Sequence, residues 1–421
     1  CFPFFNRMLV MFYRITSHFR VCDNGLCCCG GRCCFFGSID SRLIMQRDHI
    51  VVIGKGGIEQ YYERSLHGKT GFQQVEIDAG GEAVRVLANT PPVPGDNLIL
   101  SVDAKMQEIA ETAFGNRRGA LVAMDPKTGE VLSYVSMPTF DPNLFVDGID
   151  ADTWKALNGS LDRPLINRPI RGIYPPGSTF KPFVAMAGLE EGKRKPPFSI
   201  SDPGFYALAG SAHRYRDWKP EGHGSVDIQK AITVSCDTFF YGLALDLGID
   251  KLTGFVSHFG FGKKTGIDLE GEMGGLLPTP EWKYKRWKQK WFPGETVIVG
   301  IGQGYNSFTP LQLAHAVSNL SNNGIVMKPH LVKMVENGST KSRKLTVPKE
   351  SYRIPLKREN IDFVKQDLEG DQEMSARSRR LLLEDCVESN ALLCPAHFAG
   401  ANAGYIKPQG SSFRIEWDVV A

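Results

Sequence analysis

The start of the chain lacks the long apolar run that a membrane anchor or a signal peptide needs. Its apolar residues are interrupted by Arg7, Arg14 and Arg20. A membrane-spanning helix takes about 18 or more consecutive apolar residues, and a signal peptide has one continuous apolar region. We therefore expect neither kind of segment at the start of this sequence.

Cysteine is scarce beyond residue 34 and crowded before it. Only Cys236, Cys386 and Cys394 occur later, whereas seven of the ten cysteines lie at positions 1, 22, 27, 28, 29, 33 and 34. A zinc knuckle is the alternative for this region, but the early cysteines lack the C-x2-C pairs typical of one. The sequence also begins with Cys1 instead of Met. We expect residues 1–48 to contain no recognisable domain and to differ in origin from the coding sequence that follows.

The sequence has little net charge of either sign, with a formal value of +3. No basic stripe suggests a platform for stacked bases, so we expect no nucleic-acid partner. The densest basic run, at residues 283–290, carries Lys or Arg at five positions, with aromatic residues between and just after them. We interpret this run as a solvated face, and contact with an anionic polymer or a lipid surface is the alternative.

Length and composition are those of a globular protein with two or three domains. The chain has 421 residues, of which 42% are hydrophobic and 23% charged. Strand and helix patterns indicate strands, then a helical middle, then further strands, which is the α+β class. The expected elements are strands at 75–78, 84–87 and 98–102, a helix at 105–114, a hairpin at 119–135, helices over 178–260, and a helix from 309 to about 322.

The segment Pro175 to Pro182 places a serine and a lysine three residues apart, Ser178 and Lys181, at the predicted start of a helix. Residues at i and i+3 share a helical face, so the lysine amine can reach the serine hydroxyl. A serine is a weak nucleophile until a base takes its proton, and a desolvated lysine can be that base. The alternative is a Ser-x-x-Lys that occurs by chance on a helix surface.

A second motif strengthens the catalytic interpretation. Ser235 and Asp237 flank Cys236 within the stretch Ile228 to Leu247, which we expect to be mostly apolar and helical. A Ser-x-x-Lys followed by a Ser-x-Asn-like triplet and a Lys-Thr-Gly strand is typical of penicillin-recognising serine enzymes. Without Ser178, Ser235 and Asp237 would indicate only a helix surface or a helix cap.

From about Ile50 to Gly370 the sequence resembles the penicillin-binding protein 2 family, the class B peptidoglycan transpeptidases of cell elongation. The resemblance rests on matches in the same order along the chain, including Arg118 to Pro126, Tyr174 to Pro182, Ser235 to Thr238 and Gly300 to Tyr305. It implies a penicillin-binding/β-lactamase-like α+β fold, with an antiparallel sheet and a helical subdomain. The implied domains are a partial, β-rich, dimerisation-like pedestal at 49–95, a transpeptidase domain at 96–340 and its divergent end at 341–421.

The resemblance implies serine acyl transfer. Ser178 would attack the D-alanyl-D-alanine bond of a stem peptide, with Lys181 as the base. Ser235 would relay protons toward the leaving amine, and Asp237 would hold that network. The backbone N–H of Ser178 would supply half of an oxyanion hole. β-Lactams would acylate the same serine.

Asp202, Asp217, His223 and Cys236 are candidate ligands of a structural Zn²⁺. Their spacing matches no short zinc motif, so the residues alone also allow a surface pair of carboxylates, a turn histidine and a buried thiol. The resemblance favours zinc, because members of the subfamily carry ligands in Ser-Asp-Pro-Gly, Tyr-Arg-Asp-Trp, Gly-His-Gly and Ser-Cys-Asp contexts. The chemistry itself needs no cofactor.

The third motif of the family is missing from its expected place near residue 410. The triplets at 69–71, 127–129 and 264–266 read Lys-Thr-Gly but stand too early, and at the expected position the chain reads Lys407-Pro408-Gln409. Pro408 is a poor residue for a central strand. The stretch 371–395 has no visible family resemblance. We expect a truncated sheet, and impaired catalysis as a result.

Two other functions remain open at this point: a β-lactamase, and a non-catalytic scaffold that keeps the pedestal for docking. A dinucleotide site at Gly300 to Gly304 lacks the G-x-G-x-x-G spacing. The resemblance implies peptidoglycan stem peptides and β-lactams as ligands, and membrane proteins of the elongation complex, including a glycosyltransferase, as partners. It places the protein at the periplasmic face of a bacterial inner membrane.

Overall fold

A computed structural model describes residues 54–77, 83–115, 117–145 and 148–368, together with strands at 392–393, 404–409 and 412–417. The early cysteine-rich region and most of 369–403 lie outside the described residues. Within the described part, none of the helices combines the length and apolarity that a membrane crossing requires.

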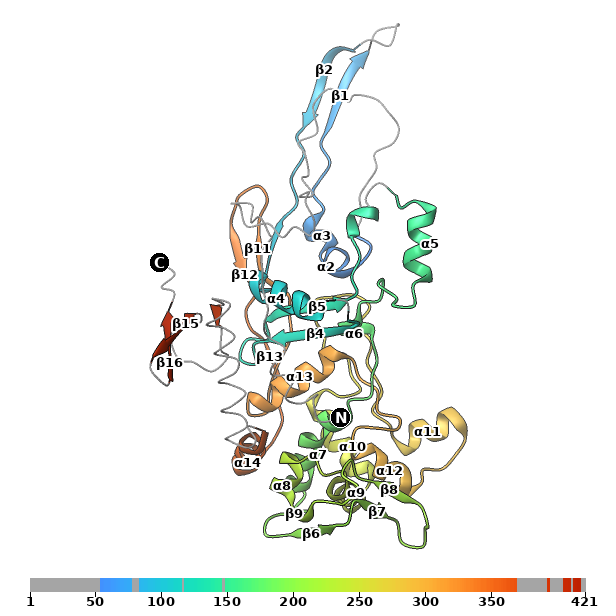
Figure 1. Ribbon diagram of the computed structural model, residues 1–421. Coiled ribbons are helices and arrows are strands. Elements are labelled where there is room, and N and C mark those ends of the chain that lie inside the picture. Colours follow the sequence, from blue (N-terminus) through green and yellow to red (C-terminus); the bar gives the residue numbers. More distant parts are fainter. Residues whose placement is uncertain are drawn as a thin grey trace.

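A long hairpin projects from one end of the molecule (Figure 1). It consists of β1 (Phe72–Ile77) and β2 (Ala83–Thr90), which pair antiparallel as their alternating side chains predict. Two short helices, α2 (Gly57–Tyr61) and α3 (Glu63–Leu66), lie at the base of the hairpin. These elements form the region expected to be the pedestal.

Short antiparallel sheets follow the pedestal. The turn at Lys127 to Gly129 joins β4 to β5, as the sequence predicts, and β3 pairs with β11 from the far end of the chain. Helix α4 covers β5. The elements are β3 (Asn97–Leu100), α4 (Ala104–Phe114), β4 (Gly119–Met124), β5 (Val131–Met137), β10 (Ile325–Met327), β11 (Val332–Glu336), β12 (Arg343–Leu345) and β13 (Glu350–Arg353).

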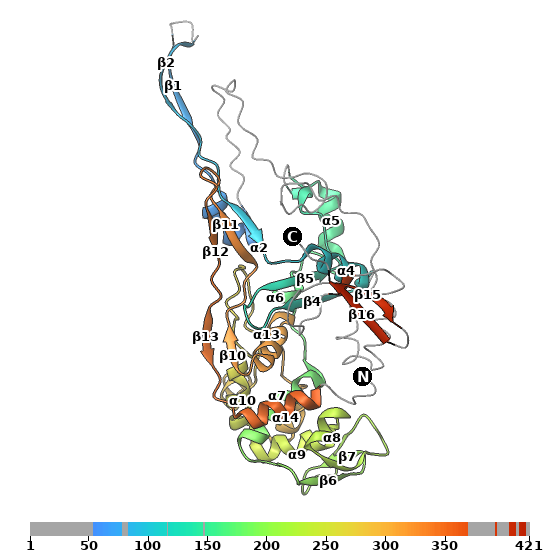
Figure 2. The ribbon, with the colours of Figure 1, turned by 90° about the vertical axis from the view of Figure 1, so that its left-hand side faces the viewer.

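A helical end lies opposite the pedestal (Figures 1 and 2). Its central helix is α7, in which every residue from Lys181 to Leu189 is buried, so it is surrounded by core on all sides. The helices of this end are α7 (Lys181–Glu190), α8 (Ile228–Thr233), α9 (Asp237–Leu247), α10 (Ile249–Val256), α11 (Pro280–Trp287), α12 (Pro293–Val299) and α14 (Arg358–Leu368). Helices α6 (Arg168–Arg171) and α13 (Pro310–Ser321) contact β4, and α5 (Ala151–Gly159) lies on the pedestal side of the molecule in Figure 1.

The core of the helical end is aromatic around α7. Phe180 and Phe183 contact each other and Phe261, and Phe308 stacks on Phe180 with ring centroids 5.9 Å apart. Burial of each such ring contributes about 1.5–3 kcal/mol. This packing fixes the start of α7, where Ser178 and Lys181 lie.

The helical stretch contains strands that the sequence analysis did not predict. They are β6 (Ser199–Asp202), β7 (Phe205–Ala207), β8 (Arg214–Arg216) and β9 (Gly224–Asp227), paired as β6 with β9 and β7 with β8. Strands of three or four residues are too short to give a recognisable alternation. Strands before, within and after the helices confirm the predicted α+β class.

The strands near the end of the chain form a sheet of their own. Among the described strands, β15 (Gly404–Gln409) pairs only with β14 (Leu392–Leu393) and β16 (Ser412–Trp417). Pro408 pairs only with Phe413 of β16, beyond the reach of the short β14. A proline that lacks an N–H is therefore accommodated on an open side of β15.

Candidate functional site

The serine of the first motif lies on a tight turn that leads into α7. The turn is a 3-10 segment, Gly177–Phe180, and helical geometry continues through Lys181. Gly177 has φ +58°, a conformation that glycine adopts without strain. Phe180 is fully buried and anchors the turn, while Ser178 stays partly accessible to solvent. The turn therefore holds the serine firmly and leaves it open to a substrate.

A second segment, Gly302 to Phe308, holds the serine turn from behind. Gly177 N–H donates to the Gly302 carbonyl at 2.9 Å, and the backbones of Tyr174 and Phe308 exchange two hydrogen bonds of 2.9 Å. A Cβ on residue 302 would stand 2.2 Å from the Gly177 oxygen, so only glycine fits there. The sequence analysis did not give this supporting role to Gly302. The three glycines within residues 300–304 were the available signal, because they predict close backbone approach.

Lys181 is buried and bound by the second motif. Its Nζ donates to the Ser235 carbonyl at 2.7 Å, to Ser235 Oγ at 2.9 Å and to Asp237 Oδ1 at 2.6 Å. Only 2% of the residue is exposed. The structure thus brings three of the four expected catalytic residues into direct contact, and Ser178 stands on the same helical turn as Lys181.

The helical stretch from Ile228 to Leu247 consists of two helices, because the chain is broken between α8 and α9. Ser235 lies in the break with φ +54°, a left-handed conformation that is uncommon for residues other than glycine. Cys236 N–H donates to the Ala231 carbonyl and closes the loop. The break turns the Ser235 carbonyl and hydroxyl toward Lys181, which an uninterrupted helix would not do.

Burial changes the proton affinities of Lys181 and Asp237. Desolvation lowers the pKa of the Lys181 amine, and the charge of Asp237 only partly offsets this. Desolvation likewise raises the pKa of Asp237, against the opposing effect of Lys181. Both shifts disfavour the charged forms. The site therefore makes it easier for Lys181 to lose its proton than in water, and only the neutral amine can accept a proton from a hydroxyl.

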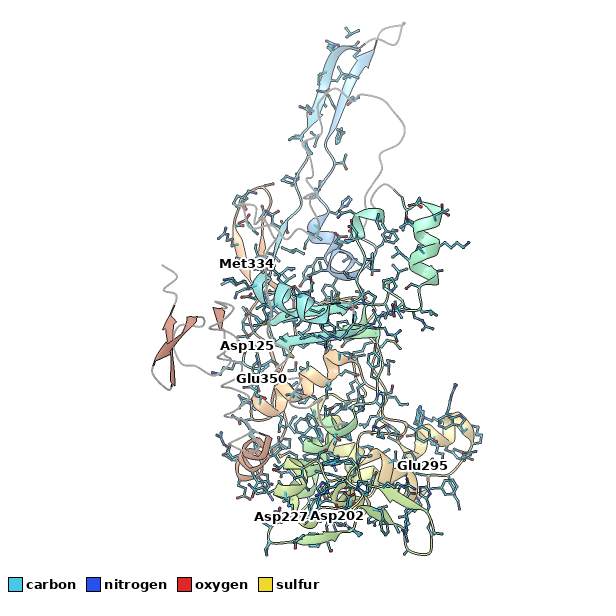
Figure 3. The ribbon with its side chains drawn as sticks, in the orientation of Figure 1. Asp125, Asp202, Asp227, Glu295, Met334 and Glu350 are labelled. Atoms are coloured by element: carbon cyan, nitrogen blue, oxygen red, sulfur yellow. The ribbon has the colours of Figure 1, made fainter. Side chains whose placement is uncertain are left out.

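The four candidate zinc ligands come together beneath this loop. The ligand atoms of Asp202, Asp217, His223 and Cys236 all lie within 4.8 Å of one another. Cys236 Sγ is 3.4 Å from one oxygen of each aspartate, and His223 Nδ1 is 2.8 Å from Asp202 Oδ2. Asp202 is the last residue of β6, opposite Gly224 of β9, and Figure 3 shows it in the helical end.

This donor set fits a tetrahedral zinc ion. Ligand atoms bound to zinc at about 2.0–2.3 Å stand roughly 3.3–3.8 Å apart. The two Cys236–aspartate separations of 3.4 Å and the 3.7 Å between His223 Nδ1 and Asp217 Oδ1 lie in this range, whereas His223 Nδ1 is closer to Asp202, at hydrogen-bond distance. Backbone N–H groups orient the carboxylates: Gly204 and His223 donate to Asp202, and Thr238 donates to Asp217. Burial raises the pKa of the Cys236 thiol, whereas a bound metal would favour the thiolate.

The three early Lys-Thr-Gly triplets have structural roles. Lys69 forms an isolated bridge with Val93, and the second triplet forms the turn between β4 and β5. In the third, Thr265 and Gly266 donate backbone N–H groups to the buried carboxylate of Glu272. Each triplet is thus used within its own local structure.

Two family models match the sequence. The penicillin-binding protein transpeptidase domain matches residues 119–380, and the penicillin-binding protein dimerisation domain matches residues 45–100. Among curated proteins, the peptidoglycan D,D-transpeptidase MrdA of Acinetobacter baumannii is 49% identical over 282 residues, or 67% of this chain and 42% of the relative. The protein of the same name from Escherichia coli K12 is 48% identical, over 66% of this chain and 44% of its own length. The chain thus spans less than half the length of these relatives.

Solved structures agree with this result. Pseudomonas aeruginosa PBP2 in complex with WCK 5153 superposes with a TM-score of 0.67 at 44% identity, covering 77% of this chain and 70% of that one. The complex of PBP2 and MreC from Helicobacter pylori gives a TM-score of 0.65 at 33% identity, covering 79% and 57%. These matches confirm the resemblance found in the sequence. The chain belongs to the penicillin-binding protein transpeptidase family.

Proposed function

We propose that this protein is a peptidoglycan D,D-transpeptidase that cross-links stem peptides through a serine acyl-enzyme. The observation that carries the proposal is the buried Lys181 amine, which binds Ser235 and Asp237 one helical turn after the accessible Ser178. The names of the matched relatives support the same activity.

We assign each side chain a step. Lys181, as the neutral amine, takes the proton of Ser178 while Oγ attacks the carbonyl carbon between the two D-alanines. The peptide bond then breaks, its nitrogen receives a proton through Ser235, and free D-alanine leaves. The amine of a neighbouring stem attacks the resulting ester, which restores the Ser178 hydroxyl and forms the cross-link. The Ser178 N–H lies at the start of α7, where it can stabilise the oxyanion.

We also propose that Asp202, Asp217, His223 and Cys236 hold a structural Zn²⁺. When bound, the ion would supply folding free energy and no reaction step. Its value for the activity would be mechanical, because Cys236 stands between Ser235 and Asp237. Fixing this residue fixes the two groups that bind the Lys181 amine.

We further propose that catalysis is impaired in this sequence. In the family, a Lys-Thr-Gly strand beside the nucleophile binds the substrate carboxylate and completes the oxyanion hole. Here β15 carries Lys407-Pro408-Gln409 instead, and among the described strands it pairs with β14 and β16 only. Loss of one oxyanion donor costs roughly 10²–10³-fold in rate. Acylation of Ser178 should be slow.

We also propose partners and a location for this protein. Because PBP2 of Helicobacter pylori forms a complex with MreC, we propose that the pedestal of this protein docks on a protein of the same kind. A glycosyltransferase of the elongation complex would supply the glycan strands. The proposed location is the periplasmic face of the inner membrane.

The deciding experiment is intact-mass spectrometry of the chain after incubation with a fluorescent penicillin. We expect one covalent adduct that maps to Ser178, forms slowly, and is absent in the Ser178→Ala variant. Rapid stoichiometric labelling would contradict the impairment, and no adduct on a folded chain would contradict the activity. Turnover of nitrocefin, a chromogenic β-lactam, would instead indicate a β-lactamase.

A further inference from the structure

The basic run at residues 283–290 is not the uniformly solvated face that the sequence suggested. Lys283 is 2% exposed and forms a buried ion pair with Glu295, with Nζ and Oε1 2.5 Å apart. Residues 284–290 and Phe292 are exposed, whereas Trp282 and Trp291 are half-buried. We name the exposed set the aromatic–cationic surface. It comprises Tyr284, Arg286, Trp287, Lys288, Lys290 and Phe292.

Three cations of this surface are not neutralised. Within the described residues, ion pairs involve Lys283 and Lys285, but none involves Arg286, Lys288 or Lys290. Lys288 lies over the exposed ring of Tyr284, and Lys290 over that of Phe292, each 5.6 Å from the ring centroid. The surface therefore offers positive charge beside exposed aromatic rings.

One ring of this surface, that of Trp287, is packed against a neighbouring aromatic cluster. Its ring centroid lies 5.1 Å from that of Tyr305, which also contacts the half-buried Trp282 and Trp291 at 5.3 and 6.2 Å. The Tyr305 hydroxyl donates to Glu295, the partner of buried Lys283. Such a packed network costs little further conformational entropy when a ligand binds.

The same chain segment supports the nucleophile. Tyr305 comes directly after Gly302 to Gly304, and Gly302 binds Gly177, the neighbour of Ser178. Helix α11 lies beside α12 in the helical end, and Figure 3 shows Glu295 at this place (Figures 1 and 3). The aromatic–cationic surface and the serine turn are thus built on one continuous piece of structure.

We propose that the aromatic–cationic surface binds the peptidoglycan strand whose stem peptide is attacked by Ser178. This inference rests on the proposed function. The apolar faces of sugar rings pack on the exposed rings of Trp287 and Tyr284. The carboxylates of uncross-linked stem peptides meet the unpaired cations, which attract them by charge and by hydrogen bonds. The surface thus selects polymeric, anionic substrate near the reacting serine.

The test measures binding of the full chain, with Ser178→Ala to prevent turnover, to soluble uncross-linked glycan strands that carry pentapeptide stems. The double variant Arg286→Glu/Lys288→Glu should weaken binding about tenfold, the loss typical of important interface residues. Lys344→Glu/Lys349→Glu, which makes the same change of charge on exposed residues elsewhere, should bind like the parent. Neutral chitooligosaccharides, which carry no carboxylate, should bind the parent and the double variant equally.

Two further measurements separate the alternatives. Unchanged strand binding by the Arg286→Glu/Lys288→Glu variant would overturn the proposal. The second measurement is binding to phosphatidylglycerol vesicles. If the variant loses only vesicle binding and keeps strand binding, the surface contacts a membrane and the proposal is also overturned. With Ser178 intact, penicillin acylation should be equal in all variants, because penicillin has no glycan. Acylation without strand binding would refute this inference alone, and strand binding without acylation would refute only the proposed activity.

Discussion

Burial decides the chemistry of Lys181. An exposed lysine stays protonated at neutral pH and cannot act as a base, but here nearly the whole side chain is enclosed by core. The sequence showed only that an apolar run follows the lysine. The contacts with Ser235 and Asp237, 54 and 56 residues away, depend on the fold.

The first prediction concerns the pH dependence of Ser178 acylation. Because burial puts the pKa of Lys181 below its usual 10.5, the neutral amine accumulates as pH rises through that lowered value. The acylation rate should therefore increase with pH and level off before pH 10.5. Lys181→Arg, which stays protonated, should be slower by about 10²–10⁴-fold and lack this rise. A quenched time course of penicillin labelling at several pH values measures the acylation rate of the parent and of the variant. A Lys181→Arg variant with the parental rate would contradict the role of Lys181 as the base.

The second prediction separates the two roles of Ser235. Its left-handed backbone costs a residue with a Cβ about 1–2 kcal/mol more than glycine. Ser235→Gly and Ser235→Ala both remove the hydroxyl and should both slow acylation. The glycine variant should nevertheless be more stable than the alanine variant by about 1 kcal/mol in urea unfolding. Equal stability of the two would show that the backbone at this position is unstrained.

At the scale of elements, the sequence predicted the helices and strands whose ends are marked by residues close to them in the chain. Thr309 and Pro310 begin α13, and the Thr309 side chain accepts from Gln312 N–H, as a capping residue should. The break between α8 and α9 had no such signal, because Ser235 is held there by contacts with distant Lys181. The aspartate, histidine and thiol cluster was found through the family contexts and not through spacing, since tertiary structure brings the four residues together.

The third prediction tests the proposed zinc site at this scale, because its four candidate ligands lie on β6, on the segments after β8 and before β9, and at the start of α9. The purified chain should contain one zinc ion, measured by elemental analysis. A metal present at about 1,000 times its Kd stabilises a fold by about 4 kcal/mol, so chelation or Cys236→Ser should lower Tm by several degrees. Asp250→Asn, an exposed carboxylate on α10, is the control. A chain without zinc, or one indifferent to chelators, would contradict the site.

At the scale of the whole molecule, one buried carboxylate joins the pedestal to the catalytic region. Asp268 accepts the Tyr62 hydroxyl at 2.9 Å, and also the backbone N–H groups of Leu331 and Val332 at 2.6 and 2.9 Å. In addition, the Asn337 side chain donates to Asp96, the residue that directly follows the pedestal at 49–95. Figure 2 shows the hairpin of β1 and β2 extending away from this junction. These contacts set the direction in which the pedestal projects.

The fourth prediction follows from this junction. Burial, and then the charge and hydrogen bond of Asp268, raise the pKa of Tyr62, so its hydroxyl remains a donor at every physiological pH. Tyr62→Phe deletes that donor and should cost about 1.5–3 kcal/mol, the range for hydrogen bonds to charged groups. Tyr61→Phe is the matched control, because this neighbouring tyrosine is 40% exposed.

Urea unfolding measures how much stability Tyr62→Phe loses, and limited proteolysis shows which part of the chain is destabilised. If Tyr62 joins the two regions, Tyr62→Phe should speed cleavage in the linker at residues 91–95, because weaker docking lets the pedestal separate more often. Cleavage inside the catalytic region should be unchanged, since Asp268 keeps its two backbone donors and continues to hold β11. Faster cleavage throughout the chain would mean that Asp268 stabilises the catalytic region through Tyr62, and that the pedestal is part of its core.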